Sequence, residues 1–452
     1  MNRNEFRILT PVGMLGYGIP AAHFWRGIES GVDAMVVDSG STDPGPYQLG
    51  LGATLVPRAA YVRDLSLMLE ACHRYRVPIY IGSAGGPGID AHVDAMIDII
   101  REISAREGYR FNVAAIYAGV DKAIVHRKLE EGSVTSCASS PPLTHDDIDA
   151  TTHIVAQMGA EPFVEAMLHG GVDIVVAGRA YDPAPYAALG IVHDVRPGVY
   201  WHMGKIMECG ANCARPKGKV IVATVRRDSF DLEPMNPAET CTPLSVAAHT
   251  LYEKTRPDRL PGPGGVLDLR GARYEQIDER TVRVSGSQFE PSPRYAVKLE
   301  GAGPIGYRTA FIGGIRDPIL IGQIDDFEAR IHAHLRAVYP EVASGEARFV
   351  FHTYGKNGVM GELEPLTQPA HELALLGEAT APNQALADAI CSSARISALH
   401  FPYPGQLATA GNLALPLNPP ETPLGPVCAF QVYHLMEIDS PTALFPIRYL
   451  EI

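Results

Sequence analysis

Residues 33–43 read DAMVVDSGSTD, and this stretch decides how the N-terminal half folds. A short apolar run is followed at once by small polar residues, which is typical of a buried strand that ends in a tight loop. Further strands are predicted at 6–13, 77–86, 111–119 and 172–179, and helices at 21–30, 61–76, 91–108, 121–132, 146–158 and 160–171. Strands that alternate with amphipathic helices form βαβ units, so we expect an N-terminal parallel sheet with helices on both faces.

The second half of the chain has a different pattern. Residues 264–291 alternate apolar and polar positions between turn residues, which indicates an antiparallel meander. Residues 219–234 are expected to form one strand that continues into a loop. The other predicted elements are strands at 307–315, 318–324, 347–355 and 428–438, and helices at 327–340 and 383–401. We therefore predict an α/β ligand-binding domain at 1–240 and an α+β domain at 241–452.

Composition excludes some classes of partner. The chain has 452 residues and a net charge of −13, so a nucleic-acid-binding surface or a surface for anionic membranes is not expected. The sequence lacks both a signal-peptide pattern at its start and an apolar stretch of transmembrane length, and its seven cysteines are scattered. We expect a cytoplasmic protein without a disulfide framework, and a homo-oligomer, as is common for such proteins.

Small residues follow each predicted parallel strand. Because the carboxyl ends of parallel strands share one edge of a sheet, these loops are expected to meet there and to bind a small anionic metabolite through backbone N–H groups. The loops are 13–18, 38–43, 83–88, 118–121 and 178–183. Arg179 can pair with a carboxylate or phosphate, and Arg179→Ala is expected to lose anion binding with little effect on the fold. The candidate ligand-binding residues here are Gly16, Ser39, Ser41, Gly85, Gly86, Arg179 and Tyr181.

Cofactor signatures are not found. The first loop reads G-x-x-G-x-G rather than the dinucleotide fingerprint G-x-G-x-x-G, and there is no NAD, PLP or ATP signature. The triplet His145-Asp146-Asp147 follows Thr144 in the pattern of a helix capping box rather than a metal site. A divalent metal stays open as an alternative, with Asp38, Asp182, Glu208 and His352 as its ligands.

Residues 347–365 gather polar groups in the C-terminal half. His352, Lys356 and Asn357 stand on a predicted strand and the Gly-rich loop that follows it, where they could supply a base, a cation and a binding group. A solvated hairpin is the other interpretation, because Asn357-Gly358 is a hairpin-turn dipeptide. Glu208, in a Gly-bounded turn, is a further candidate for acid–base chemistry.

Several segments resemble the acyclic terpene utilisation (AtuA-like) family, in its longer form of about 450 residues. They are VVDSGSTDPGP, IGSAGG, VDIVVAGRAYDPAPYAALG, HMGKIMECGANCARP, HTYGKNGVMGELEP and QLATAGNLALPLNPPE. The resemblance implies catabolism of acyclic terpenoids or other branched carboxylic acids, often as CoA thioesters, and a small companion protein. The resemblance marks six residues of this chain as candidate site positions and does not assign their roles. They are Asp38, Asp43, Arg179, Asp182, Glu208 and Cys209.

Three functions are consistent with these patterns. The first is a lyase, hydratase or isomerase that acts on a small carboxylate or its CoA thioester, because such chemistry needs only positioned acids, bases and an oxyanion site. Its candidate catalytic residues are Asp38, Asp182, Glu208, His352 and Lys356. The second is a hydrolase or lyase that depends on a divalent metal. The third is a non-catalytic subunit that needs a small partner protein.

Overall fold

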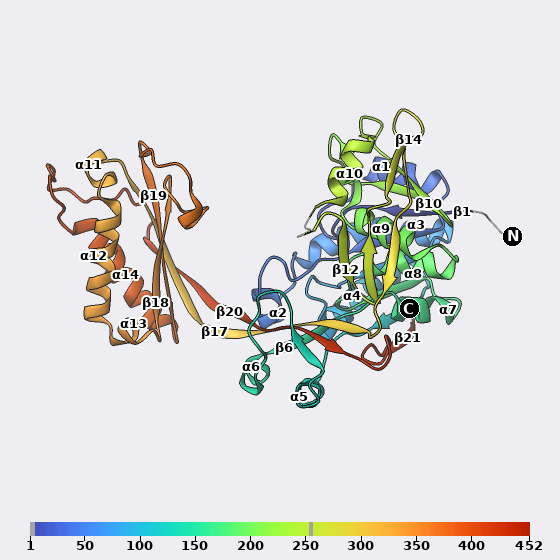
Figure 1. The fold of residues 1–452 in the computed structure, drawn as a ribbon, viewed down its shortest axis with the longest axis horizontal. Helices are drawn as coiled ribbons and strands as arrows, with labels where there is room; N and C mark the ends of the chain where they lie inside the picture. The colour runs from blue at the N-terminus through green and yellow to red at the C-terminus, as the bar shows by residue number, and fades with distance from the viewer. Residues whose placement is uncertain (1–4, 253–255) are drawn as a thin grey trace. The chain divides into compact units, whose positions relative to one another are not determined.

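A computed structural model describes residues 5–252 and 256–452 of the chain. The chain forms two compact units, one of residues 1–303 and 430–452 and the other of residues 304–429. The boundaries fall within two long strands, β17 (Ala296–Ile315) and β20 (Glu421–Glu437) (Figure 1). The boundary predicted at residue 240 falls inside the first unit, in the short strand β11 (Thr240–Cys241). The two units are described separately below.

The first unit is built on one large sheet, which has ten strands in the described residues. In spatial order they are β14 (Arg273–Gln276), β15 (Val282–Ser285), β10 (Ser229–Pro234), β9 (Ile221–Arg226), β1 (Glu5–Thr10), β2 (Ala34–Asp38), β3 (Ile79–Gly82), β7 (Ile174–Ala177), β4 (Asn112–Ile116) and β21 (Ile447–Glu451). The central strands β1, β2, β3, β7 and β4 are parallel, as predicted, and antiparallel strands extend both edges. Their carboxyl ends therefore lie along one edge of the sheet.

Successive side chains of the central strands point to opposite faces of the sheet, so the interior is divided into two cores. In β2, Ala34 and Val36 face one core, and Met35 and Val37 face the other. Helices α1 (Ala21–Glu29), α3 (Arg58–Tyr75) and α4 (Asp90–Glu107) pack in the core that contains Met35. Helices α7 (Glu161–Leu168), α8 (Ala184–Val192) and α9 (Pro197–Met207) pack in the core that contains Val36. The prediction of helices on both faces is confirmed.

Shorter elements complete the first unit. They are α2 (Tyr47–Leu51), α5 (Lys122–Glu130), α6 (His145–Ala150), α10 (Pro243–Thr250), η1 (Gly210–Cys213), β5 (Val134–Ser136), β6 (His153–Gln157), β8 (Ala214–Arg215), β12 (Arg259–Gly262), β13 (Gly265–Asp268) and β16 (Gln288–Pro291). The predicted meander at 264–291 is antiparallel, but it contributes β13 and β16 to a small sheet and β14 and β15 to the large one.

Two sequence predictions in this unit are wrong in part. Residues 146–158 do not form one helix, because α6 ends at Ala150 and residues 153–157 form β6, which pairs with residues 298–302 of β17. Residues 219–234 form a hairpin of β9 and β10 rather than one strand. In both cases pairing with another strand decides the structure, and local periodicity does not report such pairing.

The second unit is an antiparallel sheet with helices packed against it. Besides its parts of β17 and β20, it contains α11 (Pro318–Ile321), α12 (Ile324–Val338), α13 (Pro340–Ser344), β18 (Arg348–Tyr354), η2 (Gly361–Leu363), β19 (Leu373–Ala381) and α14 (Gln384–His400). The strand predicted at 318–324 is wrong, since Asp317 caps helix α11 by accepting the Ile319 N–H and Pro318 takes the first helical position.

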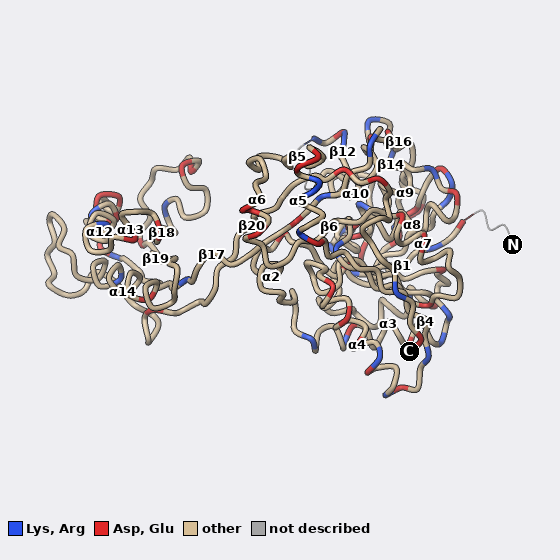
Figure 2. Tube along the Cα trace, turned by 90° about the horizontal axis from the view of Figure 1, so that it is seen from below, with Lys and Arg blue, Asp and Glu red and all other residues tan. Residues whose placement is uncertain are grey.

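Both units contain acidic and basic residues. In the trace of each unit, acidic and basic residues are intermixed along the elements (Figure 2). Within the described ranges, no helix is both long enough and apolar enough to cross a membrane.

Candidate functional site

Asp38 and Arg179 stand at the carboxyl edge of the parallel sheet. Asp38 is the last residue of β2, and Arg179 and Asp182 lie in the turn between β7 and α8. The sequence places them there because each apolar strand ends where its small polar loop begins. β3 separates β2 from β7 in the sheet, so the two loops converge over the end of β3, where Ser83 lies.

Arg179 is buried and already paired within the protein. Its Nε donates to Glu300 Oε2 at 2.7 Å, and its Nη1 donates to the Ala180 carbonyl at 2.8 Å and to Asp182 Oδ1 at 3.2 Å. Only 2% of its surface is exposed. We therefore expect Arg179→Ala to destabilise the fold, contrary to the sequence prediction, because the substitution would take this partner away from the buried Glu300.

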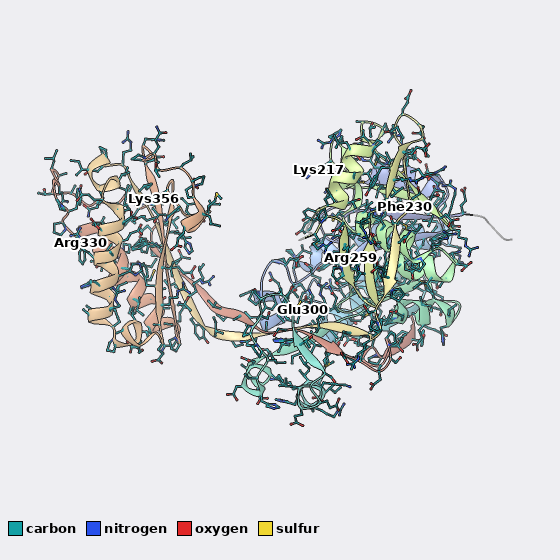
Figure 3. The ribbon with its side chains drawn as sticks, viewed as in Figure 1. Lys217, Phe230, Arg259, Glu300, Arg330 and Lys356 are labelled. Atoms are coloured by element: carbon teal, nitrogen blue, oxygen red, sulfur yellow. The ribbon has the colours of Figure 1, made fainter. Side chains whose placement is uncertain are left out.

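Glu300 lies on β17 and completes the ion-pair network (Figure 3). It is fully buried, and Lys298 Nζ lies 2.6 Å from its Oε1. Burial opposes its ionisation, but Arg179 and Lys298 outweigh burial and lower the pKa of Glu300 to about 2. Glu300 is therefore an ionised structural carboxylate at neutral pH.

Asp38 has the opposite environment. Its Oδ2 accepts the Gly40 N–H at 3.2 Å, while its buried Oδ1 has no hydrogen-bond partner among the described residues. Burial raises the pKa of Asp38 well above its usual value, and the nearby Asp182 and Glu208 raise it further, against the lowering effect of Arg179. Asp38 is therefore a carboxyl group that is inclined to hold a proton.

A second ion pair lies beside Asp182. Lys205 Nζ, on α9, is 2.5 Å from Oε1 of Glu208. Burial opposes the charge of Lys205, but Glu208 and Asp182 raise the pKa of Lys205 above its usual value. Burial also raises the pKa of Asp182, and Arg179 and Lys205 offset part of that rise. Asp38, Asp182 and Glu208 thus form one electrostatically connected group of carboxyls.

A cavity of about 460 Å³ adjoins this carboxyl group through Tyr181. Burial and the nearby Glu208 raise the pKa of Tyr181 far above its usual value, so its hydroxyl keeps its proton. The cavity wall includes Pro261, Val266, Leu435, Arg294 and Lys298. It therefore combines a mainly apolar wall with two cationic side chains.

The glycine-rich loops after β1 and β4 are not open anion cradles. Gly16 and Gly18 donate their N–H groups to Oδ2 of the buried Asp64, at 2.9 and 3.0 Å. Gly119 donates to Asp90 at 2.9 Å. The predicted ligand-binding N–H of Gly16 is therefore occupied by the protein's own carboxylate.

The other predicted loop residues lie around Asp38. The N–H of Ser39 donates to the Gly82 carbonyl, and the Ser41 hydroxyl accepts the N–H of Asp43 at 3.2 Å. Gly86 donates to the Ser83 carbonyl at 3.0 Å, and Gly85 packs against His92. These residues shape the edge mainly through their backbone.

His352, Lys356 and Asn357 belong to the second unit, where Figure 3 labels Lys356. His352 is on β18, and Lys356 forms an ion pair with Asp325 of α12. The backbone of Asn357 and Gly358 donates to the Thr353 carbonyl, so these residues form the turn that ends β18. Their candidate roles in catalysis and binding stay predictions.

Within residues 5–252 and 256–452, no three His, Cys, Asp or Glu side chains are grouped so as to hold a metal ion. The capping box predicted at Thr144 is confirmed, because Thr144 and Asp147 bond reciprocally. Cys213 lies 3.9 Å from Cys241, sulfur to sulfur, rather than beside a ligand pair.

Sequence reasoning missed Lys205 and Glu300. Lys205 had a usable signal, since it stands three residues before Glu208 and such spacing places both on one helical face. Glu300 had none, because its partner Arg179 is 121 residues away in the chain.

Comparison with known proteins identifies the family. The model of the "Acyclic terpene utilisation family protein AtuA" matches residues 58–216 and 232–412, which is most of the chain. Comparisons with curated proteins and with solved structures find no match. The matched residues include Arg179, Asp182, Lys205, Glu208 and Glu300, while Asp38 precedes the matched range. The chain belongs to the acyclic terpene utilisation family, and this membership indicates a role in the catabolism of acyclic terpenes.

Proposed function

We propose that the protein is an enzyme that moves protons next to the carbonyl of a small carboxylate or its CoA thioester, with Asp38 as the group that holds the proton. The observation that carries the proposal is the buried Oδ1 of Asp38, which has no partner among the described residues. A buried carboxyl with a raised pKa is typical of a general acid.

The charges at the sheet edge support this role. The network comprises four carboxyl groups and three cationic groups, namely Asp38, Asp182, Glu208, Glu300, Arg179, Lys205 and Lys298. Glu300 is held ionised by its two cations, so the surplus negative charge falls on the remaining carboxyls. A proton on Asp38 removes that surplus, and an ionised Asp182 or Glu208 could then act as the base.

The cavity beside Tyr181 suits such a substrate. Its apolar wall can bury a short aliphatic chain, and Arg294 and Lys298 can attract a carboxylate or the phosphates of a CoA group. Lys298 also pairs with Glu300, so an anion at the cavity would be linked electrostatically to Arg179 and Asp182. The protonated Tyr181 can donate a hydrogen bond to the carbonyl oxygen.

Exchange of α-protons tests the proposal. Isovaleryl-CoA and isovalerate are each incubated with the protein in D₂O. We expect at least one of the two compounds to lose its α-proton signal in ¹H NMR. Asp38→Asn is expected to slow exchange by about 10²-fold or more, since general acid–base catalysis contributes on that scale. The control Asp98→Asn changes an exposed acid on α4 and should exchange like the wild type. Exchange at the wild-type rate in Asp38→Asn would contradict the role of Asp38.

A further inference from the structure

Strand β18 forms one edge of the sheet in the second unit. It pairs with β19 on one side, and no strand of the described residues pairs with it on the other. Its sequence, RFVFHTY, contains neither proline nor lysine, two residues with which proteins commonly protect an exposed edge. An edge of this kind is a template for pairing with a further strand.

The register shows which backbone groups of β18 point away from β19. Gly314 of β17 exchanges both of its backbone hydrogen bonds with Ala414, so it has none left for β19. Because successive residues of a strand bond to opposite sides, odd-numbered residues of β17 bond to β19, and even-numbered residues of β19 bond to even-numbered residues of β18. Phe349, Phe351 and Thr353 therefore direct their N–H and C=O groups outward.

Only part of this outward row is used within the chain. The Thr353 carbonyl accepts the N–H groups of residues 356–358, which form the turn after β18. Within the described residues, no loop or neighbouring strand bonds to the N–H and C=O groups of Phe351 or to the C=O group of Phe349. These groups, with the Thr353 N–H, are available to a second chain.

A second copy of the chain fits this edge in antiparallel orientation. About a two-fold axis centred on Phe351, the two Phe351 residues can exchange both of their hydrogen bonds. The Thr353 N–H of each copy can then donate to the Phe349 carbonyl of the other. On the sheet face away from the helices, Arg348 lies opposite Tyr354 of the second copy. Both side chains are exposed, and a guanidinium stacks favourably on an aromatic ring.

Helix α12 runs beside β18 and carries a matching charge pattern. Glu328 accepts the Thr353 hydroxyl at 2.5 Å. The rings of His332 and Phe351 are 5.7 Å apart, so α12 runs antiparallel to β18 and His332 is level with the axis. Four residues to either side of His332 stand Glu328 and Arg336, so the axis brings Glu328 of one copy level with Arg336 of the other. Arg336 is exposed and forms no ion pair within the described residues.

We propose that this edge is the interface of a symmetric homodimer, in which β18 of two copies pair and their sheets become continuous. The occupant is a second copy because the pattern is self-complementary: each copy supplies both the acidic and the basic position of α12, and both the guanidinium and the ring on β18. The proposal does not depend on the proposed function, since β18 and α12 belong to the second unit and Asp38 to the first.

Sedimentation velocity of the full-length protein over a concentration series tests the proposal. The wild type is expected to form a dimer. Arg336→Glu turns two attractive pairs into two repulsive ones and is expected to weaken dimerisation by about tenfold or more. The control Arg330→Glu makes the same change in charge on the side of α12 that contacts Pro402, and it should dimerise like the wild type (Figure 3).

Amide exchange in protein with ¹⁵N-labelled phenylalanine locates the interface. The Phe351 N–H is expected to be protected in the wild type and to exchange about tenfold faster or more in Arg336→Glu. Phe351→Leu identifies its resonance. The Phe311 N–H bonds within the sheet, so it should stay protected in both proteins and shows that the variant is folded.

The outcomes separate the alternatives. A dimer that Arg336→Glu weakens, with a protected Phe351 amide, supports the proposal. A wild type that stays monomeric at every concentration would overturn it. A dimer in which the Phe351 amide exchanges freely would also overturn it, because another surface would then form the interface. Equal dimerisation of Arg336→Glu and Arg330→Glu would overturn the pairing of the two α12 helices on which the proposal rests.

Discussion

The loops that follow β1 and β2 differ in how each one contacts a buried carboxylate. In the first loop, Gly16, Gly18 and Ile19 direct their N–H groups at Asp64, a fully buried carboxylate on α3. In the second loop, the buried carboxylate is Asp38 itself, and one of its oxygens has no partner among the described residues. One aspartate holds a loop together, whereas the other keeps a buried oxygen unbonded.

The comparison teaches that a glycine-rich loop is not in itself a ligand site. What separates the two cases is whether a distant carboxylate already occupies the backbone donors. Asp64 is 48 residues from Gly16, and Asp90 is 29 residues from Gly119. Asp64 and Asp90, which each accept two or more backbone N–H groups, should therefore contribute more to stability than Asp38, which accepts one.

The largest effect is expected at Glu300. Glu300→Ala leaves the buried Arg179 with Asp182 as its remaining acidic partner and takes the carboxylate away from the half-buried Lys298, and loss of one partner from a buried ion pair costs about 3–5 kcal/mol. Urea unfolding measures this change. The matched variant Glu290→Ala breaks an exposed pair with Arg259 and should cost far less, because solvent screens exposed ion pairs. Equal losses in the two variants would contradict the structural role of Glu300.

A smaller loss is expected at Asp64. Asp64→Ala removes the acceptor of three backbone N–H groups in the loop after β1 and should cost about 2–3 kcal/mol in urea unfolding. Hydrogen exchange should show faster exchange at Gly16 and Gly18 in particular. If those amides stay protected, the loop is held by something other than Asp64.

Asp90 should matter less. Asp90→Ala removes the acceptor of the Ala118 and Gly119 N–H groups. The Asp90 side chain is exposed to solvent, so water can replace its carboxylate as the acceptor. The expected loss in unfolding free energy is about 1 kcal/mol. A loss as large as that of Asp64→Ala would show that exposure does not separate the two loops.

Asp38→Asn should not destabilise the protein at neutral pH. The pKa of Asp38 is higher in the folded protein than the value of 3.8 expected in the unfolded chain. The wild type therefore loses stability as the pH rises from 3.8 through the folded-state pKa of Asp38. The amide variant has no such loss, so its stability relative to wild type should increase with pH from pH 4 upward. Near pH 4 the two should agree within about 1 kcal/mol. A relative stability that falls with pH would mean that Asp38 is stabilised as an anion.

The fold was largely predictable, because its central strands and long helices carry their own periodicity. The strand at Ala34–Asp38 and the helix at Asp90–Glu107 follow from local sequence. The strand at His153–Gln157 does not, because its partner in β17 is more than a hundred residues away.

The candidate site was predictable only in part. Asp38, Arg179 and Asp182 follow predicted strands, whereas Glu208 follows helix α9, which the sequence did not predict. The structure brings these four residues together at one edge. Their partners decide what each one does, and the sequence does not specify those partners. Arg179 was expected to bind a ligand, yet Glu300 occupies its guanidinium.

The protonation state of Asp38 tests the central claim most directly. Infrared difference spectra between wild type and Asp38→Asn at pH 7 should contain the carbonyl stretch of a protonated carboxyl that the variant lacks, with the small shift that D₂O produces. A carboxylate band in its place would show that Asp38 is ionised at neutral pH, and it would contradict the proposal that this residue holds the proton for catalysis.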